Sequence, residues 1–291
     1  MGEPENRFAR RLTGALLALL FGAGIAGPAT AQSEAPPQGS PAQSQGSAQV
    51  SVALVLAVDT SGSVSMSRFE LQKQGYAAAF RNPQVLNAVR SLGTHSIAVT
   101  MFQWTGPFLH IVVADWTLIK DTPSAEAFAG AIDAAPRKLF GGGTSISGAI
   151  DYARTLLAQS PYKGARRIID VSGDGSNNSG RPAATARDEA VADGIGINGL
   201  PILTVEPGLD HYYFTNVIGG PGAFMVPVAN YDNFADAILK KLINEIAAGP
   251  AFDQINVRMA STSRPQTRPS LRRDFAASAI FKSDFAKAVS R

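Results

Sequence analysis

The chain of 291 residues contains no cysteine and only three histidines. Disulfide bonds, thiolate zinc sites and cysteine nucleophiles are therefore excluded. The histidines, His95, His110 and His211, show none of the spacings of zinc-binding histidine motifs, which argues against a histidine zinc site. Any metal site in this sequence must be built mainly from oxygen ligands.

Charge is also scarce, because Asp, Glu, Lys and Arg together make up 17% of the residues. The net charge of +3 is unevenly placed: residues 249–291 carry eight basic and three acidic side chains, whereas residues 32–248 have a net charge of −3. The basic character therefore belongs to the C-terminal segment. It gives no argument for a nucleic-acid groove in the core, and we expect no nucleic-acid partner.

The N-terminus has the pattern of an export signal. Three arginines precede an apolar stretch over residues 14–26, and residues 29–31 (Ala-Thr-Ala) form a small-x-small cleavage site. The stretch is shorter than the roughly 20 residues of a transmembrane helix, so an uncleaved anchor is the less favoured alternative. We predict a signal peptide over residues 1–31 and a periplasmic or secreted protein.

Composition divides the remaining chain into three parts. Residues 32–48 are rich in Pro, Gln, Ser and Gly, which predicts a spacer. Residues 49–248 form the folded domain. Residues 249–291 are rich in Ser, Thr, Pro and Arg, which is typical of disorder, although residues 274–289 have an amphipathic pattern. A solvated basic tail is favoured over one that contacts membrane headgroups.

Strand and helix patterns alternate within residues 49–248. Residues 52–58 are a continuous apolar run, typical of a strand buried on both faces. Residues 96–104 and 108–116 are joined by three residues, too few for a parallel crossover, so they should pair as an antiparallel hairpin. We expect an α/β fold with a doubly wound, mostly parallel sheet and one antiparallel edge hairpin. Further strands are expected over 167–172, 195–204 and 224–228. Helices are expected after Ser63, over 84–91, 122–134, 182–193 and 232–247, and through Ile150 and Leu156 after the glycine loop.

Three loops with oxygen-bearing side chains should meet at one edge of this sheet. Asp59, Ser61 and Ser63 follow the first buried strand, Thr144 follows three glycines, and Asp174 follows another buried strand. Ligands bind beyond the carboxyl ends of the strands in such folds. Two carboxylates and three hydroxyls form a hard ligand set that suits Mg²⁺, and Mn²⁺ or Ca²⁺ would also fit.

This set of residues resembles the metal-ion-dependent adhesion site (MIDAS) of von Willebrand factor type A (vWA) domains. The resemblance covers roughly residues 50–248 and all five positions match. It implies that Ser61, Ser63 and Thr144 bind the cation directly, while Asp59 and Asp174 hold it mainly through water. It also implies a non-enzymatic protein whose metal grips an Asp or Glu of a protein partner.

The segments Asp170-Val-Ser-Gly-Asp-Gly-Ser-Asn-Asn178 and Ile197-Asn-Gly-Leu-Pro-Ile202 resemble an uncharacterised subfamily of bacterial exported proteins within this family. Of the nearby residues, Asn177 and Asn178 are expected to shape their loop, and Arg181 to be solvated. Trp104, Trp116, Phe102 and Phe224 are expected to pack in the core or at strand ends.

Other functions are considered for the same residues. The hydroxyl and carboxyl groups at strand–helix junctions could simply cap helices, and the cation could merely stabilise a scaffold. Asp59 and Asp174 could form an aspartic-protease dyad, but that enzyme class is all-β. Asp174 with Asn198 could hold the Mg²⁺ of a thiamine-diphosphate enzyme, which needs a longer chain. A metal-dependent hydrolase remains a further alternative, although no His, Lys or Cys lies near the loops in the sequence.

Overall fold

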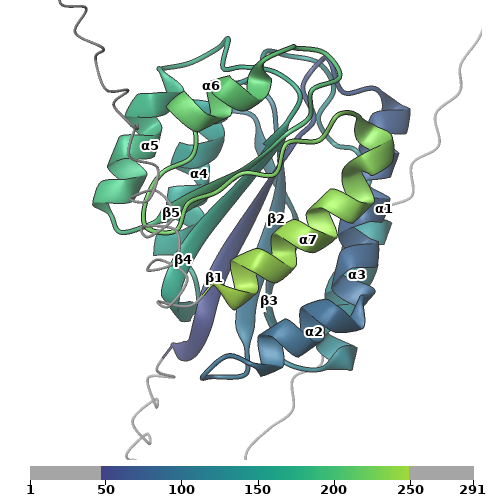
Figure 1. The fold of residues 1–291 in the computed structure, drawn as a ribbon, viewed down its shortest axis with the longest axis vertical. Helices are drawn as coiled ribbons and strands as arrows, with labels where there is room; N and C mark the ends of the chain where they lie inside the picture. Colours follow the sequence, from purple (N-terminus) through teal and green to yellow (C-terminus); the bar gives the residue numbers. More distant parts are fainter. Residues whose placement is uncertain (1–46, 249–291) are drawn as a thin grey trace, which may run out of the picture. The chain divides into compact units, whose positions relative to one another are not determined.

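The computed structural model describes residues 47–248, so the predicted signal peptide, most of the spacer and the tail lie outside the described residues. The described part contains a five-stranded sheet in the order β3-β2-β1-β4-β5 (Figure 1). All neighbours pair in parallel except β2 and β3, which are antiparallel. The strands are β1 (Ala48–Asp59), β2 (Ile97–Trp104), β3 (His110–Ile119), β4 (Tyr162–Gly173) and β5 (Gly196–Pro201).

Helices cover both faces of this sheet, as Figure 1 shows. Alternate side chains of β1 point to opposite faces: Leu54 and Leu56 pack with α1, α2, α3 and α7, whereas Val55 and Ala57 pack with α4, α5 and α6. The expected fold class and the antiparallel edge hairpin are therefore confirmed. The helices are α1 (Met66–Arg81), α2 (Pro83–Arg90), α3 (Thr122–Ala134), α4 (Ile146–Ala158), α5 (Ala183–Ala192), α6 (Leu209–Asn216) and α7 (Phe234–Ala247), with a 3₁₀ turn, η1 (Tyr231–Asn233).

Two elements differ from the sequence-based expectation. The strand predicted over residues 224–228 is wrong, since this segment makes only isolated bridges, from Met225 to Gly199 and from Val228 to Ile202. Pro201 has no N–H group to donate between these two bridges, which interrupts the ladder there. Helix α6 was not expected, because it has no side-chain N-cap. Among the described helices, none is long and apolar enough to cross a membrane.

A charged cluster lies in the core beneath α7. The side chain of Lys241 is fully buried and forms ion pairs with the buried carboxylates of Asp170 on β4 and Glu245 on α7. Asn198 of β5 donates to Glu245 at 2.9 Å. Burial raises the pKa of Glu245 to about 7 and also raises the pKa of Asp170, because a single ammonium group does not compensate two desolvated carboxylates.

This cluster gives the unfolding free energy a pH dependence. The folded chain keeps the Glu245 proton up to about pH 7, whereas the unfolded chain releases it near the ordinary value of 4.5. Stability should therefore fall as the pH rises through this window. Glu245→Gln should flatten the fall, measured by urea unfolding at several pH values, while exposed Glu126→Gln should not. An unchanged slope in Glu245→Gln would contradict this assignment.

Candidate metal site

The predicted site residues meet at the carboxyl ends of β1 and β4. The Ser61 hydroxyl oxygen lies 3.3 Å from that of Ser63 and 3.4 Å from that of Thr144. The Ser63 hydroxyl donates to the carboxylate of Asp174. Asp59 is the last residue of β1 and its carboxylate accepts from the Ser61 amide at 2.7 Å. Contacts between side chains thus connect Ser61, Ser63, Thr144 and Asp174, and Asp59 joins them through the Ser61 amide.

The glycine-rich loop brings Thr144 to this point through its backbone. Gly142 has a φ of 86°, a left-handed conformation, and a Cβ there would lie 2.8 Å from the Thr105 hydroxyl. That hydroxyl holds the loop through the carbonyl groups of Gly141 and Gly143, at 2.7 and 3.0 Å. The Gly62 amide donates to the Gly142 carbonyl at 3.3 Å, which joins this loop to the one after β1.

Both oxygens of the fully buried Asp174 have partners. Ser63 donates to one, and the Tyr231 hydroxyl donates to the other at 2.9 Å. The guanidinium of Arg68 lies 3.5 Å from this second oxygen and also donates to the Ser63 carbonyl at 2.8 Å. These groups fix the Asp174 carboxylate in place, which suits a carboxylate that holds a cation through water rather than directly.

Asp59, in contrast, has an unsatisfied oxygen. Its Oδ2 atom is buried and has no hydrogen-bond partner. Burial raises the pKa of Asp59 to about 7, and the nearby charge of Asp174 adds to this rise. A buried carboxylate oxygen without a partner costs about 1–3 kcal/mol, more if it is charged. A cation, or a water bound to one, would supply the missing interaction.

The donor set fits a hard divalent cation. Two oxygens about 2.1 Å from an octahedral Mg²⁺ lie about 3 Å apart, near the separations of 3.3 and 3.4 Å found between the hydroxyls. Hydrogen-bonded hydroxyls usually approach to about 2.8 Å, so these contacts are too long to be optimal hydrogen bonds. Within residues 47–248 no group of three or more His, Cys, Asp or Glu side chains could hold a metal, so the hydroxyls are essential to this site. That these residues bind a metal stays a prediction.

Several residues around the site have no signal in the sequence. Tyr231 and Arg68 contact Asp174, and Arg137 donates to the Thr60 carbonyl at 2.9 Å. Glu206 accepts from the Ser176 amide at 2.7 Å and so lies beside the Asp174 loop. Each comes from a different segment, and only the tertiary structure brings them to this edge.

The two asparagines shape their loop, as expected. The Asn178 side-chain oxygen accepts from the Thr144 amide at 2.8 Å, and that of Asn177 accepts from the Ser147 amide at 3.0 Å. They tie the loop after β4 to the start of α4. The site is therefore assembled by backbone contacts between loops as well as by its own side chains.

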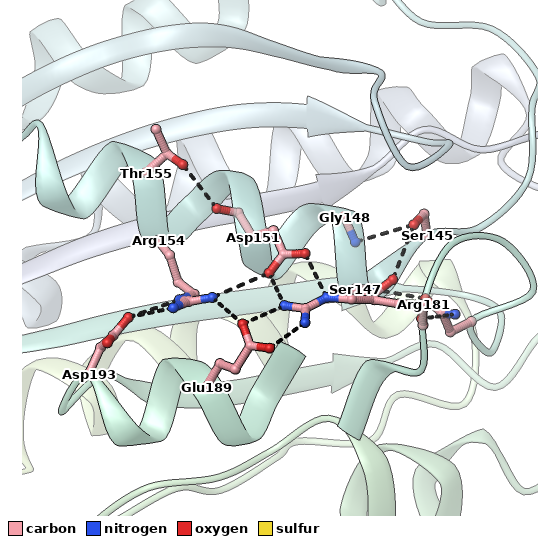
Figure 2. Close-up of polar contacts among 10 residues, drawn as sticks. Ser145, Ser147, Gly148, Asp151, Arg154, Thr155, Arg181, Glu189 and Asp193 are labelled. Atoms are coloured by element: carbon pink, nitrogen blue, oxygen red, sulfur yellow. Dashed lines mark hydrogen bonds and ion pairs between the residues drawn. The ribbon is translucent and has the colours of Figure 1, made fainter. Parts of the chain in front are cut away.

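The expectation that Arg181 is simply solvated is wrong. Figure 2 shows its guanidinium between α4 and α5, where it pairs with Asp151 and Glu189. Arg154 of α4 pairs with Glu189 and Asp193 in the same network. Because both acidic partners lie on rigid helices, Arg181 anchors the end of the loop that carries Asn177.

The other expectations can be compared with the same structure. Phe102 and Trp104 are fully buried, as expected of core aromatic residues. Asn198 pairs with Asp170 in the β4–β5 register and binds Glu245, so it does not lie with Asp174 at the strand ends. This placement argues against the thiamine-diphosphate alternative. The α/β fold excludes the all-β aspartic-protease architecture.

Comparison with known proteins agrees with this fold. A family model described as "Protein of unknown function (DUF1194)" matches residues 49–250. Among proteins with curated descriptions, none matches. Proximal thread matrix protein 1 (PTMP1) from the mussel byssus has a similar structure, with a TM-score of 0.52, 15% identity, and coverage of 69% of this chain and 49% of that chain.

Two bacterial structures are also similar. The pilus adhesin SpaC from Lactobacillus rhamnosus GG has a TM-score of 0.50 and 16% identity, with 68% of this chain and 30% of that chain covered. A von Willebrand factor type A structure from Catenulispora acidiphila has a TM-score of 0.49 and 18% identity, with 68% and 43% covered. This chain thus matches about half or less of each of these proteins. At such identities the likeness to the mussel protein and the pilus adhesin establishes a shared fold alone.

Proposed function

We propose a function from the site itself for this chain, which belongs to the family described as "Protein of unknown function (DUF1194)". The proposal is that the protein is an exported binding protein that uses one vWA-type domain. A Mg²⁺-type cation at Asp59, Ser61, Ser63, Thr144 and Asp174 would grip an Asp or Glu side chain of a protein partner. Export rests on the signal-like sequence of residues 1–31.

The observation that carries this proposal is the unequal role of the two carboxylates. Each oxygen of Asp174 already accepts a hydrogen bond, whereas one oxygen of Asp59 has no partner. We expect the three hydroxyls, whose oxygens lie 3.3 and 3.4 Å apart, to bind the cation directly, and the free oxygen of Asp59 to accept from a water bound to it. A divalent cation with neutral direct ligands keeps most of its charge, so it would attract a further carboxylate strongly.

Binding is favoured over catalysis by the groups that surround the site. No Lys, His or Cys of the described residues contacts the five side chains, and Arg68 is paired with Asp174. Asp59 has a raised pKa but is fully buried, so it cannot reach a substrate as a general base. A hydrolase would need a base with access to a bound molecule.

Capture of a partner tests this function. The full chain, immobilised and incubated with an envelope extract, should retain a partner in millimolar Mg²⁺ and release it in EDTA. Thr144→Ala should lose at least tenfold of this capture, because it removes a direct ligand. Thr155→Ala is the matched control, since this exposed threonine lies on α4 and bonds only within its helix. If Thr144→Ala in EDTA captured as much partner as the natural sequence does in Mg²⁺, the proposal would be overturned.

A further inference from the structure

Large apolar side chains are exposed around the candidate site. Five of them form what we call the apolar rim: Met66, Phe108, Leu109, Phe140 and Val205, which are 51%, 90%, 51%, 67% and 48% exposed. Among the described residues, the other exposed large apolar side chains are Phe214 on α6 and, at 36%, Leu71 on α1. Exposed apolar side chains that gather in one place commonly mark a binding surface.

Contacts place the rim on the loops that build the site. The guanidinium of Arg137 stacks on Phe140 at 5.1 Å and donates to the Thr60 carbonyl. The turn with Phe108 and Leu109 is held to the glycine loop, since the Leu109 carbonyl accepts from Thr105 and the Thr105 hydroxyl binds that loop.

The remaining rim residues flank the two carboxylate loops. Met66 is the first residue of α1, three positions after Ser63. Val205 precedes Glu206, which binds the Ser176 amide beside Asp174. A ligand for this surface therefore needs a carboxylate for the cation and apolar side chains next to it for the rim.

The chain's own C-terminal segment has this chemistry. Asp274-Phe275 and Asp284-Phe285 each place a carboxylate beside an aromatic ring, with Ile280 and Phe281 between them. Basic residues flank both pairs, as in Arg272-Arg273-Asp274, and residues 249–291 carry a net charge of +5 against −3 for residues 32–248. The carboxylates and apolar side chains of residues 274–285 thus suit the cation and the rim, and the basic residues that flank them in the tail complement the negative charge of the domain.

The length of the chain allows this segment to reach the site. Helix α7 starts next to the site, where Tyr231 binds Asp174, and its 14 residues carry the chain about 21 Å away. Asp274 follows Ala248 by 26 positions, which is an extended reach of about 85 Å. Asp253 also has an adjacent phenylalanine, but it follows Ala248 by five positions, a reach of about 17 Å that falls short of the helix length.

We infer that residues 274–285 dock on the apolar rim of their own domain and present Asp274 or Asp284 to the cation, as a built-in competitor of the external partner. This inference rests on the proposed function, because it requires the same metal. Attachment through a linker gives an effective concentration on the order of 1 mM, so even a weak carboxylate ligand would occupy the site. An external partner must then displace the tail.

Nuclear magnetic resonance of the full chain with Mn²⁺ tests the inference. Paramagnetic Mn²⁺ broadens the amide signals of residues close to it, whereas Mg²⁺ does not. We expect Mn²⁺ to broaden Gly143 and Gly175 at the site and also residues 274–285, several-fold more than residues 255–265. Asp274→Asn combined with Asp284→Asn should remove the tail broadening and keep that of the site. The control Asp253→Asn should keep both.

The outcomes separate the two claims. Broadening at Gly143 and Gly175 without broadening of the tail, or tail broadening that persists in the double variant, would overturn the docking inference and leave the metal site in place. Broadening at neither place would instead remove the proposed function. Tail broadening that disappears when the Mn²⁺-loaded protein is diluted tenfold would show that the tail docks on another molecule. That result would overturn docking within one chain.

Discussion

Lys241→Met should lower the unfolding free energy by about 3–5 kcal/mol, the usual cost of removing one partner of a buried ion pair. Lys241 is fully buried, and its loss leaves Asp170 and Glu245 as two buried carboxylates without a cation. Methionine has a similar volume, so the loss would reflect charge rather than a cavity. Urea unfolding at pH 7 measures the difference.

The neighbouring residue supplies the control for this prediction. Lys240→Met makes the same chemical change at an exposed position of the same helix, and it should alter stability by less than about 0.5 kcal/mol. At pH 5 the loss in Lys241→Met should shrink, because Glu245, whose pKa burial raises to about 7, is then neutral, and burial raises the pKa of Asp170 as well. Equal effects of the two substitutions would contradict the assignment of the buried cluster.

Asp59→Asn should abolish stabilisation by divalent cations while the metal-free protein stays folded. A cation at a hundred times its Kd adds about 2.7 kcal/mol to the unfolding free energy. Asparagine keeps an oxygen for the Ser61 amide but removes a buried negative charge next to Asp174. The variant in EDTA should therefore be at least as stable as the natural sequence, and it should gain nothing from Mg²⁺.

Thermal unfolding with and without Mg²⁺ checks this expectation, and Asp236→Asn on the exposed face of α7 is the control. The control should keep the full Mg²⁺ response. A Mg²⁺ response that survives in Asp59→Asn would place the cation elsewhere. A variant that unfolds in EDTA would show that Asp59 has a structural role instead.

The sequence predicts the frame of the site because each signal is local. The three-residue connection at residues 105–107 allows only a hairpin, and the buried strands end at Asp59 and near Asp174. Since parallel strands end at one edge, the loops had to meet. The geometry brings all five predicted residues into one chain of contacts, with Asp59 joined through the Ser61 amide.

The surroundings of the site could not be read from the sequence in the same way. Tyr231 lies 57 positions from Asp174, and no periodicity links them. Arg181 looks like a lone surface arginine until α4 and α5 place acids on both sides of it. Residues 224–228 have the composition of a strand, but the missing N–H group of Pro201 on β5 limits them to bridges. Long-range packing decides each of these cases.

Equilibrium dialysis of the full chain against Mn²⁺, with the bound metal measured directly, tests the central claim. We expect one Mn²⁺ per chain, displaced by excess Mg²⁺, with binding lost in both Asp59→Asn and Thr144→Ala and retained in Asp236→Asn. Absence of bound Mn²⁺, or one bound ion that neither Asp59→Asn nor Thr144→Ala removes, would contradict the assignment of these residues as the metal site.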